Sequence, residues 1–120
     1  MFHQRSILIV EDEPLIALDL AAQVVARAGR VIGPLPTVAE ALTVLESEEI
    51  AAAILDANLA DRDVTPVALL LARKGVPFVL HSAIGIPNVL KEQLPLLTLV
   101  PKPADPSIVI ARLLAVMEGR

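Results

Sequence analysis

Five short apolar runs, spread along 120 residues, restrict the folds open to this chain more than any other feature of its sequence. None of the runs shows a strong alternation of polar and apolar residues, which favours parallel strands that are covered on both faces. Longer amphipathic segments separate the runs, as in a series of strand–helix units. The strands predicted from these runs are Ile7–Val10, Arg30–Gly33, Ala51–Leu55, Phe78–His81 and Leu97–Val100.

Helix start and stop signals follow each apolar run. Gly85, Pro87 and Pro95 leave room for only a short or irregular fourth helix, around Asn88–Gln93. The other predicted helix boundaries are Pro14 and Gly29 for the first helix, Thr37 with Glu40 at the start of the second, Thr65 with Pro66 and Gly75 for the third, and Asp105 with Pro106 at the start of the last.

Five strand–helix units predict an α/β fold, a doubly wound five-stranded parallel sheet with the strand order 2-1-3-4-5. A chain of 120 residues fits one domain, so we expect residues 1–120 to form a single domain. In such open sheets ligands bind outside the carboxyl ends of the strands. The loops after the strands are therefore where a functional site is expected.

Composition excludes several classes of function. A net charge of −4 gives no basic surface for nucleic acid, and an aromatic content of 2 % gives no surface for stacking bases. The absence of cysteine excludes disulfides, a thiol nucleophile and a cysteine-based zinc site. No apolar stretch reaches the ~18 residues that a membrane span needs. We therefore expect a cytoplasmic protein that binds neither nucleic acid nor membrane.

Polar and charged residues stand within two residues of the ends of four of the predicted strands. Glu11 and Asp12 follow the first strand, Asp56 the third, Ser82 the fourth and Lys102 the fifth. The first and third strands are neighbours in the expected order, so their carboxylates meet, and they repel one another unless a cation lies between them. Mg²⁺ prefers such oxygen ligands. A carboxylate can attack phosphorus to form an acyl phosphate, which Lys102 and Ser82 would stabilise by charge and hydrogen bonding.

Each of these residues alone also has a structural interpretation. Glu11 and Asp12 could favour the N-terminus of the helix that begins at Pro14, and Asp56 could cap a loop. What favours a site is that all of them are expected at one edge of the sheet.

Over its whole length the chain resembles the receiver domains of two-component response regulators, a bacterial signalling family. The resemblance rests on the segments Ile7–Pro14 (ILIVEDEP), Ala53–Leu59 (AILDANL), Leu80–Ala83 (LHSA) and Val100–Pro103 (VPKP). It implies that Asp56 accepts a phosphoryl group from a histidine kinase, a histidine phosphotransfer protein or a small acyl phosphate.

The resemblance also implies roles for the neighbouring residues. Mg²⁺ is the implied cofactor, bound directly by Asp12 and Asp56, mainly through water by Glu11, and by the backbone carbonyl of Asn58. The Ser82 hydroxyl and the backbone N–H of Ala83 would hydrogen-bond the phosphoryl group, and Lys102 would pair with it.

Several positions depart from the family pattern. Leu99 stands where many receivers carry an aromatic residue that moves inward on activation. Asn58 and Ile84 occupy two positions that modulate dephosphorylation, and Ile84 has no group that could orient a water, so we expect a long-lived phosphoryl group. Pro77–Phe78 and the broken fourth helix resemble a subgroup of stand-alone receivers.

We therefore predict a non-enzymatic module that switches a protein-binding surface. A homodimer partner or a downstream protein is expected to bind the surface formed by the fourth helix, the fifth strand and the last helix, where residues 108–117 carry more apolar positions than one packed face needs. One alternative is a receiver excised from a larger hybrid kinase or multidomain regulator. Another is a small aspartyl-phosphate phosphatase, although such enzymes commonly carry a second Asp where this chain has Asn58.

Three further expectations concern single residues. We predict that His81 is a structural histidine whose hydrogen bonds are satisfied, and that His3 is a disordered terminal residue. Asp61, Arg62 and Asp63 are predicted to form a solvated loop.

Overall fold

The computed structural model, which describes residues 1–119, contains one sheet of five parallel strands in the predicted order β2-β1-β3-β4-β5. Each strand agrees with its predicted range to within two residues at either end. The strands are β1 (Ser6–Val10), β2 (Arg30–Leu35), β3 (Ala52–Asp56), β4 (Phe78–Ser82) and β5 (Thr98–Pro101).

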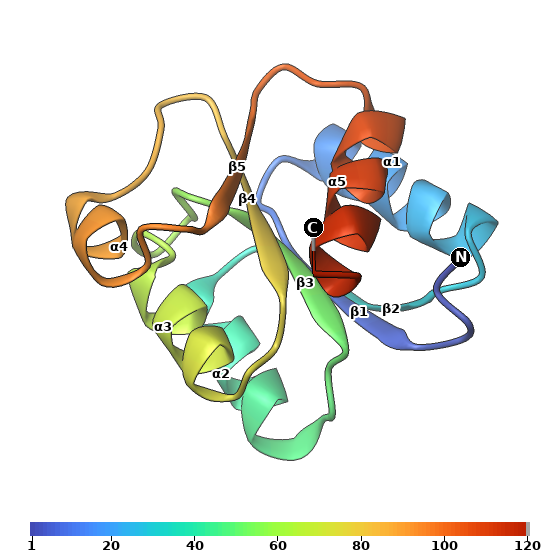
Figure 1. Cartoon of the computed structure of the whole chain (residues 1–120), viewed down its shortest axis with the longest axis horizontal. Coiled ribbons are helices and arrows are strands. Elements are labelled where there is room, and N and C mark those ends of the chain that lie inside the picture. Colours follow the sequence, from blue (N-terminus) through green and yellow to red (C-terminus); the bar gives the residue numbers. More distant parts are fainter. Residues whose placement is uncertain (120) are drawn as a thin grey trace.

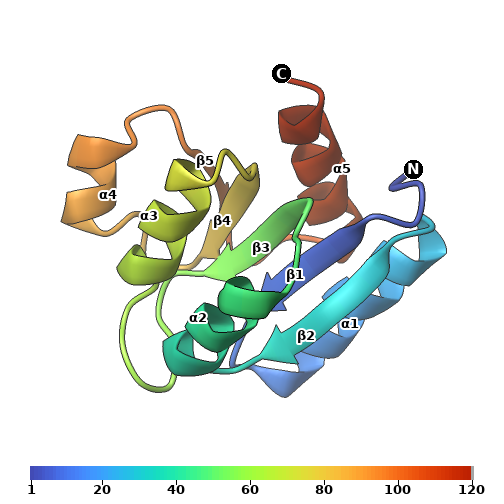
Figure 2. The same ribbon diagram turned by 90° about the horizontal axis from the view of Figure 1, so that it is seen from below.

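The five described helices cover both faces of the sheet, as Figure 1 and Figure 2 show. Helices α1 (Pro14–Ala26) and α5 (Pro106–Met117) lie on one face. Helices α2 (Val38–Ser47), α3 (Thr65–Arg73) and α4 (Asn88–Gln93) lie on the other, and α4 is as short as predicted. No helix within residues 1–119 has the length and apolar character needed to cross a bilayer.

Two apolar layers form because alternate residues of each strand point to opposite faces of the sheet. In β1, Ile7 and Ile9 pack with the residues of α1 and α5, whereas Leu8 and Val10 pack with those of α2 and α3. The core is almost wholly aliphatic, and all five residues of β3 and of β4 are buried. The sheet is therefore covered on both faces, so a polar site has room only at the ends of the strands.

The N-terminus is packed against the body of the domain, so the predicted disorder of His3 is wrong. Phe2 is fully buried in the α1–α5 layer, and its backbone N–H donates to Arg27 O at 2.8 Å. The backbone N–H of Gln4 donates to Ala28 O at 2.7 Å. His3 itself is exposed within the turn that these contacts hold.

Thr37 and Asp105 cap the N-termini of α2 and α5, and Gly75 follows α3 with a positive φ, as predicted. Two other helix-boundary predictions need correction. Thr65 is the first residue of α3 and not its cap, because Asp63 Oδ1 accepts its N–H at 2.8 Å. Helix α1 ends at Ala26, and the left-handed residue that follows is Ala28, with a φ of 62°.

Gly29 is required for a reason other than ending the helix. A Cβ atom at this position would lie 2.6 Å from Val24 Cγ1 and 2.9 Å from Phe2 Cδ2, closer than carbon atoms can approach. The glycine therefore allows the N-terminal segment to pack against α1.

Asp61, Arg62 and Asp63 are all exposed, which confirms the predicted solvated loop, but Asp61 also joins this loop to α2, a contact that was not predicted. The Asp61 carboxylate accepts the backbone N–H groups of Val38 at 2.8 Å and Ala39 at 3.1 Å. The hydrogen bond from Val38, followed by that from Ala39, lowers the pKa of Asp61. Arg62 is exposed, as expected. The loop after Asp56 is thus joined to the first turn of α2.

Helix α5 leaves less apolar surface uncovered than its composition predicts. Val109, Ile110 and Leu113 are buried, and Ile108 is 52 % exposed. Leu114, Val116 and Met117 are half-buried against the α1–α5 layer. The apolar surface is smaller than expected because α5 packs on α1 as well as on the sheet.

Candidate functional site

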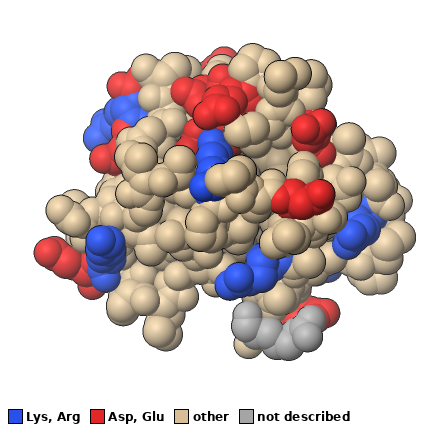
Figure 3. All heavy atoms as spheres, turned by 90° about the horizontal axis from the view of Figure 1, so that it is seen from above, with Lys and Arg blue, Asp and Glu red and all other residues tan. Residues whose placement is uncertain are grey.

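The carboxyl ends of the strands bring the predicted site residues to one edge of the sheet. Glu11 and Asp12 follow β1 directly, and Asp56 is the last residue of the adjacent strand β3. Ser82 ends β4, and Lys102 follows β5. Figure 3 shows acidic side chains gathered on this side of the molecule, with a basic side chain beside them. The strand order alone therefore accounts for the grouping.

Three carboxylates form the centre of this site. One oxygen each of Glu11, Asp12 and Asp56 lies within 4.8 Å of the others. Glu11 is 3 % exposed and Asp56 7 %, while Asp12 is half-buried. Asn58 is exposed beside them, and its backbone N–H donates to Asp56 Oδ1 at 3.4 Å. Carboxylates this close repel one another strongly in a site with little water.

Lys102 is the cation that the structure places against the carboxylates. Its Nζ atom lies 3.1 Å from Glu11 Oε1, 3.4 Å from Asp56 Oδ2 and 3.6 Å from Glu13 Oε1. Burial disfavours the ammonium, but the contacts with Glu11, Asp56 and Glu13 outweigh burial and raise the pKa of Lys102. The lysine is held in its charged form at the point where the carboxylates meet.

Glu13 is a partner of this site that the sequence did not single out. Besides contacting Lys102, it donates its backbone N–H to Glu11 Oε2 at 3.2 Å. The available signal was the run of three acids, Glu11 to Glu13, of which only the first two were assigned to the site.

One ammonium does not balance the charge of this cluster. Burial, followed by the neighbouring Asp56, raises the pKa of Glu11 to about 7, although Lys102 and the Glu13 N–H act in the opposite direction. Burial and Asp56 also raise the pKa of Asp12. The site therefore favours an additional positive charge, either a proton or a bound cation.

The donor set fits Mg²⁺, the cofactor that the family resemblance implies. Mg²⁺ binds carboxylate, carbonyl and water oxygens. The site offers three carboxylates, and buried Glu11 Oε1, although close to Lys102, accepts no directed hydrogen bond from residues 1–119. A buried oxygen that accepts no directed hydrogen bond, and an excess of negative charge, are both what a hard cation would satisfy.

Ser82 and Ala83 lie at the rim of the carboxylate cluster. The Ser82 side chain is buried, and its Oγ accepts the backbone N–H of Ile84 at 3.2 Å. Within residues 1–119 it makes no side-chain hydrogen bond to Asp56 or Lys102. Ala83 is exposed, and the backbone N–H of Lys102 donates to Ser82 O at 2.9 Å, which aligns the ends of β4 and β5.

The prediction that the hydrogen bonds of His81 are satisfied within the protein is wrong. The residue is 3 % exposed, and neither Nδ1 nor Nε2 has a partner among the described residues. Burial, followed by the charge of Lys102, lowers the pKa of His81. The ring is thus a neutral, buried and unpartnered group beside Asp56, its neighbour in the sheet.

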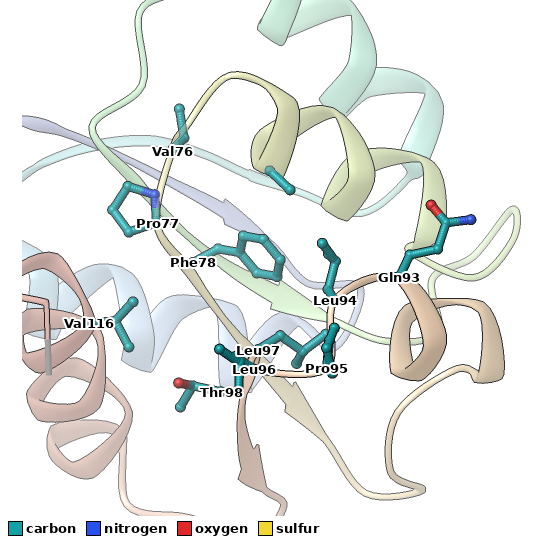
Figure 4. Close-up of a pocket in the computed structure, with 11 residues that line it drawn as sticks. Val76, Pro77, Phe78, Gln93, Leu94, Pro95, Leu96, Leu97, Thr98 and Val116 are labelled. Atoms are coloured by element: carbon teal, nitrogen blue, oxygen red, sulfur yellow. The ribbon is translucent and has the colours of Figure 1, made fainter.

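A hollow lies away from the carboxylates, between the start of β4, the segment before β5 and the ends of α3 and α5 (Figure 4). Its volume is about 370 Å³, and Phe78 and Leu94 point into it. None of its lining side chains titrates, so it offers no acid, base or metal ligand.

The raised pKa of Glu11 predicts that stability declines with pH when divalent cations are removed. The folded chain keeps the Glu11 proton up to about pH 7, whereas an unfolded chain releases it near 4.5. The folded state therefore binds more protons between these values, and its free energy of unfolding falls as pH rises. We expect a loss of about 2 to 3 kcal/mol between about pH 5 and pH 8, measured by urea unfolding with EDTA present.

Glu11→Gln should remove most of this decline, and Glu92→Gln, an exposed carboxyl on α4, serves as the matched control. An unchanged decline in Glu11→Gln would mean that other groups cause it.

Comparisons with known proteins relate the whole chain to solved structures. No family model matches the sequence, and a comparison with curated proteins also gave no match. The solution structure of SdrG from Sphingomonas melonis Fr1 is 34 % identical, with 98 % of this chain and 99 % of SdrG covered and a TM-score of 0.79. SdrG from Pseudomonas melonis Fr1 in its BeF3-activated conformation is 36 % identical, with 98 % of each chain covered and a TM-score of 0.73.

Two further structures extend the comparison. The response regulator PhyR from Brucella abortus is 30 % identical with a TM-score of 0.77, and the match covers 96 % of this chain but 49 % of PhyR. The CheY-like response regulator receiver domain protein from Methanospirillum hungatei JF-1 has a TM-score of 0.83, with 96 % of this chain and 94 % of that chain covered. At 19 % identity it supports the fold alone.

Proposed function

The chain belongs to the receiver domains of two-component response regulators, and from this we propose that it accepts a phosphoryl group on Asp56 and converts this into a change of protein-binding surface. The observation that carries the proposal is the position of Asp56. Asp56 is the last residue of β3. Its carboxylate lies 3.4 Å from Lys102 Nζ and shares a site with the carboxylates of Glu11 and Asp12.

The proposed reaction is a phosphoryl transfer to a carboxylate. An Asp56 oxygen attacks the phosphorus of a phosphohistidine or of a small acyl phosphate. A bond forms between that oxygen and phosphorus, while the bond from phosphorus to the donor nitrogen or oxygen breaks and its electron pair leaves with the donor. The product is an aspartyl phosphate, a mixed anhydride.

The residues around Asp56 would offset the negative charge of the incoming phosphoryl group and hold it in position. Glu11, Asp12 and Asp56, with the backbone carbonyl of Asn58, would hold Mg²⁺. When bound, Mg²⁺ supplies positive charge that offsets the phosphoryl oxygens. Lys102, already charged and close to Asp56, would pair with one of those oxygens.

The Ser82 hydroxyl is suited to form a hydrogen bond with the phosphoryl group. Its Oγ accepts the N–H of Ile84, so the hydroxyl hydrogen remains available to donate to a phosphoryl oxygen, with the Ala83 N–H beside it. Ile84 is 78 % exposed and carries no polar group that could orient an attacking water. This supports a long-lived phosphoryl group.

A phosphodonor protein would approach over exposed apolar residues next to the site. Leu15 of α1 is 78 % exposed and Leu18 64 %, and Ile84 lies after Ser82. We propose that a histidine kinase or a histidine phosphotransfer protein packs here. Val89, Leu96 and Ile108, also exposed, support the surface of α4, β5 and α5 for a homodimer or a downstream protein.

A phosphoacceptor module accounts for Asn58 better than a phosphatase does. An amide cannot serve as the general acid that a turnover enzyme needs two residues after its nucleophile. The BeF3-activated conformation of SdrG supports the same proposal, because BeF3 imitates a phosphoryl group on a carboxylate. The site would work in the same way within a longer regulator, such as PhyR, of which the match covers 49 %.

Intact-mass measurement after incubation with acetyl phosphate and Mg²⁺ tests this function. We expect one phosphoryl group per chain, and no labelling when EDTA replaces Mg²⁺. Continuous release of phosphate from several phosphomonoesters, at many turnovers per chain, would contradict the proposal and favour the phosphatase.

A further inference from the structure

The segment that follows Asp56 folds into a small backbone hairpin. Asn58, whose carbonyl the family resemblance assigns to Mg²⁺, pairs with Asp63 in an isolated antiparallel bridge. Two backbone hydrogen bonds flank this pair, from Val64 N–H to Ala57 O at 2.9 Å and from Leu59 N–H to Arg62 O at 3.1 Å. Residues 57–64 are called the β3–α3 hairpin below.

The bridge fixes the direction of the Asn58 carbonyl. The hydrogen bonds of the hairpin come from the residues on either side of the pair, so the N–H and C=O of Asn58 both point away from Asp63. The N–H donates to Asp56 Oδ1 at 3.4 Å, and the C=O accepts no hydrogen bond from residues 1–119. The carbonyl oxygen therefore lies on the edge of the hairpin that faces Asp56, and its position depends on where the hairpin is held.

The hairpin is too small to hold that position alone. A two-stranded hairpin is marginally stable at best in water, and this one has two backbone hydrogen bonds. Leu59 and Val64 anchor its two arms in the apolar layer of α2 and α3. At its tip, Ala60 and Asp61 are both exposed, so polar contacts must fix the tip.

Asp61 holds the tip against the first turn of α2, which lies beside the loop in Figure 2. Its Oδ1 accepts the Val38 N–H at 2.8 Å and its Oδ2 accepts the Ala39 N–H at 3.1 Å. Ala60 N–H adds a longer hydrogen bond to Pro36 O, at 3.4 Å. Hydrogen bonds from a helix N-terminus to a carboxylate are among the strong ones, and two of them fix the direction as well as the distance of the contact.

Capping of α2 does not by itself account for this contact. Thr37 already caps the helix, since its Oγ1 accepts the Glu40 N–H at 3.1 Å. Asp61 comes from more than twenty residues away along the chain and binds two further N–H groups of the same turn. The contact therefore joins two segments, and one of them carries Asn58.

We propose that Asp61 is a positioning residue for Mg²⁺: by anchoring the β3–α3 hairpin on α2, it holds the Asn58 carbonyl beside the carboxylates of the site. This inference rests on the proposed function, which supplies the metal. Asp61 is not itself a ligand, because both of its oxygens are bound to α2. Since coupling between two contacts is reciprocal, bound Mg²⁺ should in turn strengthen the contact between Asp61 and α2.

Titration with MgCl2, followed by the backbone amide signal of Asn58 in NMR spectra, measures the dissociation constant. Asp61→Asn should raise it about two- to tenfold, because an amide has one acceptor oxygen and turns its NH2 group toward the second N–H. Asp63→Asn is the matched control. It removes the same charge from the same hairpin, but one oxygen is enough to accept the Thr65 N–H, so Mg²⁺ binding should stay unchanged.

Val38→Pro tests the contact from the side of α2 and leaves the charge of Asp61 in place. Val38 is the first residue of α2, where proline fits, and Thr37 before it is already extended, with φ −132° and ψ 154°. Loss of this N–H should raise the dissociation constant about two- to fivefold. Combined with Asp61→Asn, it should add less than it does alone. If Val38→Pro fails to fold, Asp61→Asn and Asp63→Asn still decide.

Two further measurements separate positioning from a general loss of stability. Hydrogen exchange at the Ala39 amide should slow when Mg²⁺ is added to the unaltered chain, but not when it is added to Asp61→Asn. Labelling of Asp61→Asn by acetyl phosphate should be slower than normal at low Mg²⁺ and normal at saturating Mg²⁺, because excess metal compensates for weaker binding.

The proposal is overturned if the unaltered chain binds Mg²⁺ and Asp61→Asn binds it equally well. In that case the proposed function stands and only the role of Asp61 falls. An unaltered chain that binds no Mg²⁺ would overturn both this inference and the role of Mg²⁺ in the proposed function.

Discussion

Asp56→Asn is expected to abolish phosphoryl labelling by acetyl phosphate and Mg²⁺ while the domain stays folded. The amide has the shape of the carboxylate but lacks the negatively charged oxygen that attacks phosphorus. The substitution also removes a carboxylate that helps to raise the pKa of Glu11 and Asp12, so folding should not suffer. Intact mass measures the labelling, and urea unfolding measures the stability.

Asp63→Asn is the matched control, because Asp63 is an exposed carboxyl in the loop that follows Asp56. It contacts the first residue of α3 and should leave labelling complete. Labelling that persists in Asp56→Asn would assign the phosphoryl group to another residue.

The fold was predictable because short apolar runs leave few alternatives. Strands that are buried on both faces, such as β3 and β4, need helices on each side, and the boundary signals at Pro14, Gly75 and Asp105 were strong. The grouping of Glu11, Asp12, Asp56 and Lys102 followed from the strand order, because parallel strands end at one edge. Local sequence and topology were therefore enough to locate the candidate site.

What sequence reasoning missed depends on residues that are distant along the chain. Asp61 accepts N–H groups from Val38 and Ala39, more than twenty residues earlier. The missing partners of His81 could be recognised only once the elements around its ring were known. Glu13 was not assigned to the site, and its contact with Lys102 joins the loop after β1 to the loop after β5, the first and last strands along the chain.

Leu99 bears on how the domain would respond to a phosphoryl group. The side chain is half-buried and packs against the apolar layer of α2, α3 and α4, as a strand residue of the core would. Because it already packs inward and has no polar tip, it does not offer the movement expected of an aromatic residue at this position. This supports a response carried mainly by Ser82 and the exposed loop that follows it.

Phe2→Ala is expected to lower the free energy of unfolding by about 3 to 5 kcal/mol, the usual cost of removing a buried aromatic ring. Phe2 is fully buried in the α1–α5 layer and lies next to Gly29. Its carbonyl accepts the Arg5 side chain at 2.9 Å, and its N–H binds the end of α1. Removing the ring would leave a cavity between the N-terminal turn and α1. Urea unfolding at a fixed pH measures the loss.

His3→Ala is the control, since the neighbouring side chain is exposed and its removal should change stability by less than about 0.5 kcal/mol. The contrast matters because both residues stand at a terminus, where sequence reasoning favours disorder. A Phe2→Ala variant as stable as His3→Ala would show that the N-terminal segment is not held against α1. Gly29→Ala does not test this point, because the added Cβ would still meet Val24 Cγ1 at 2.6 Å.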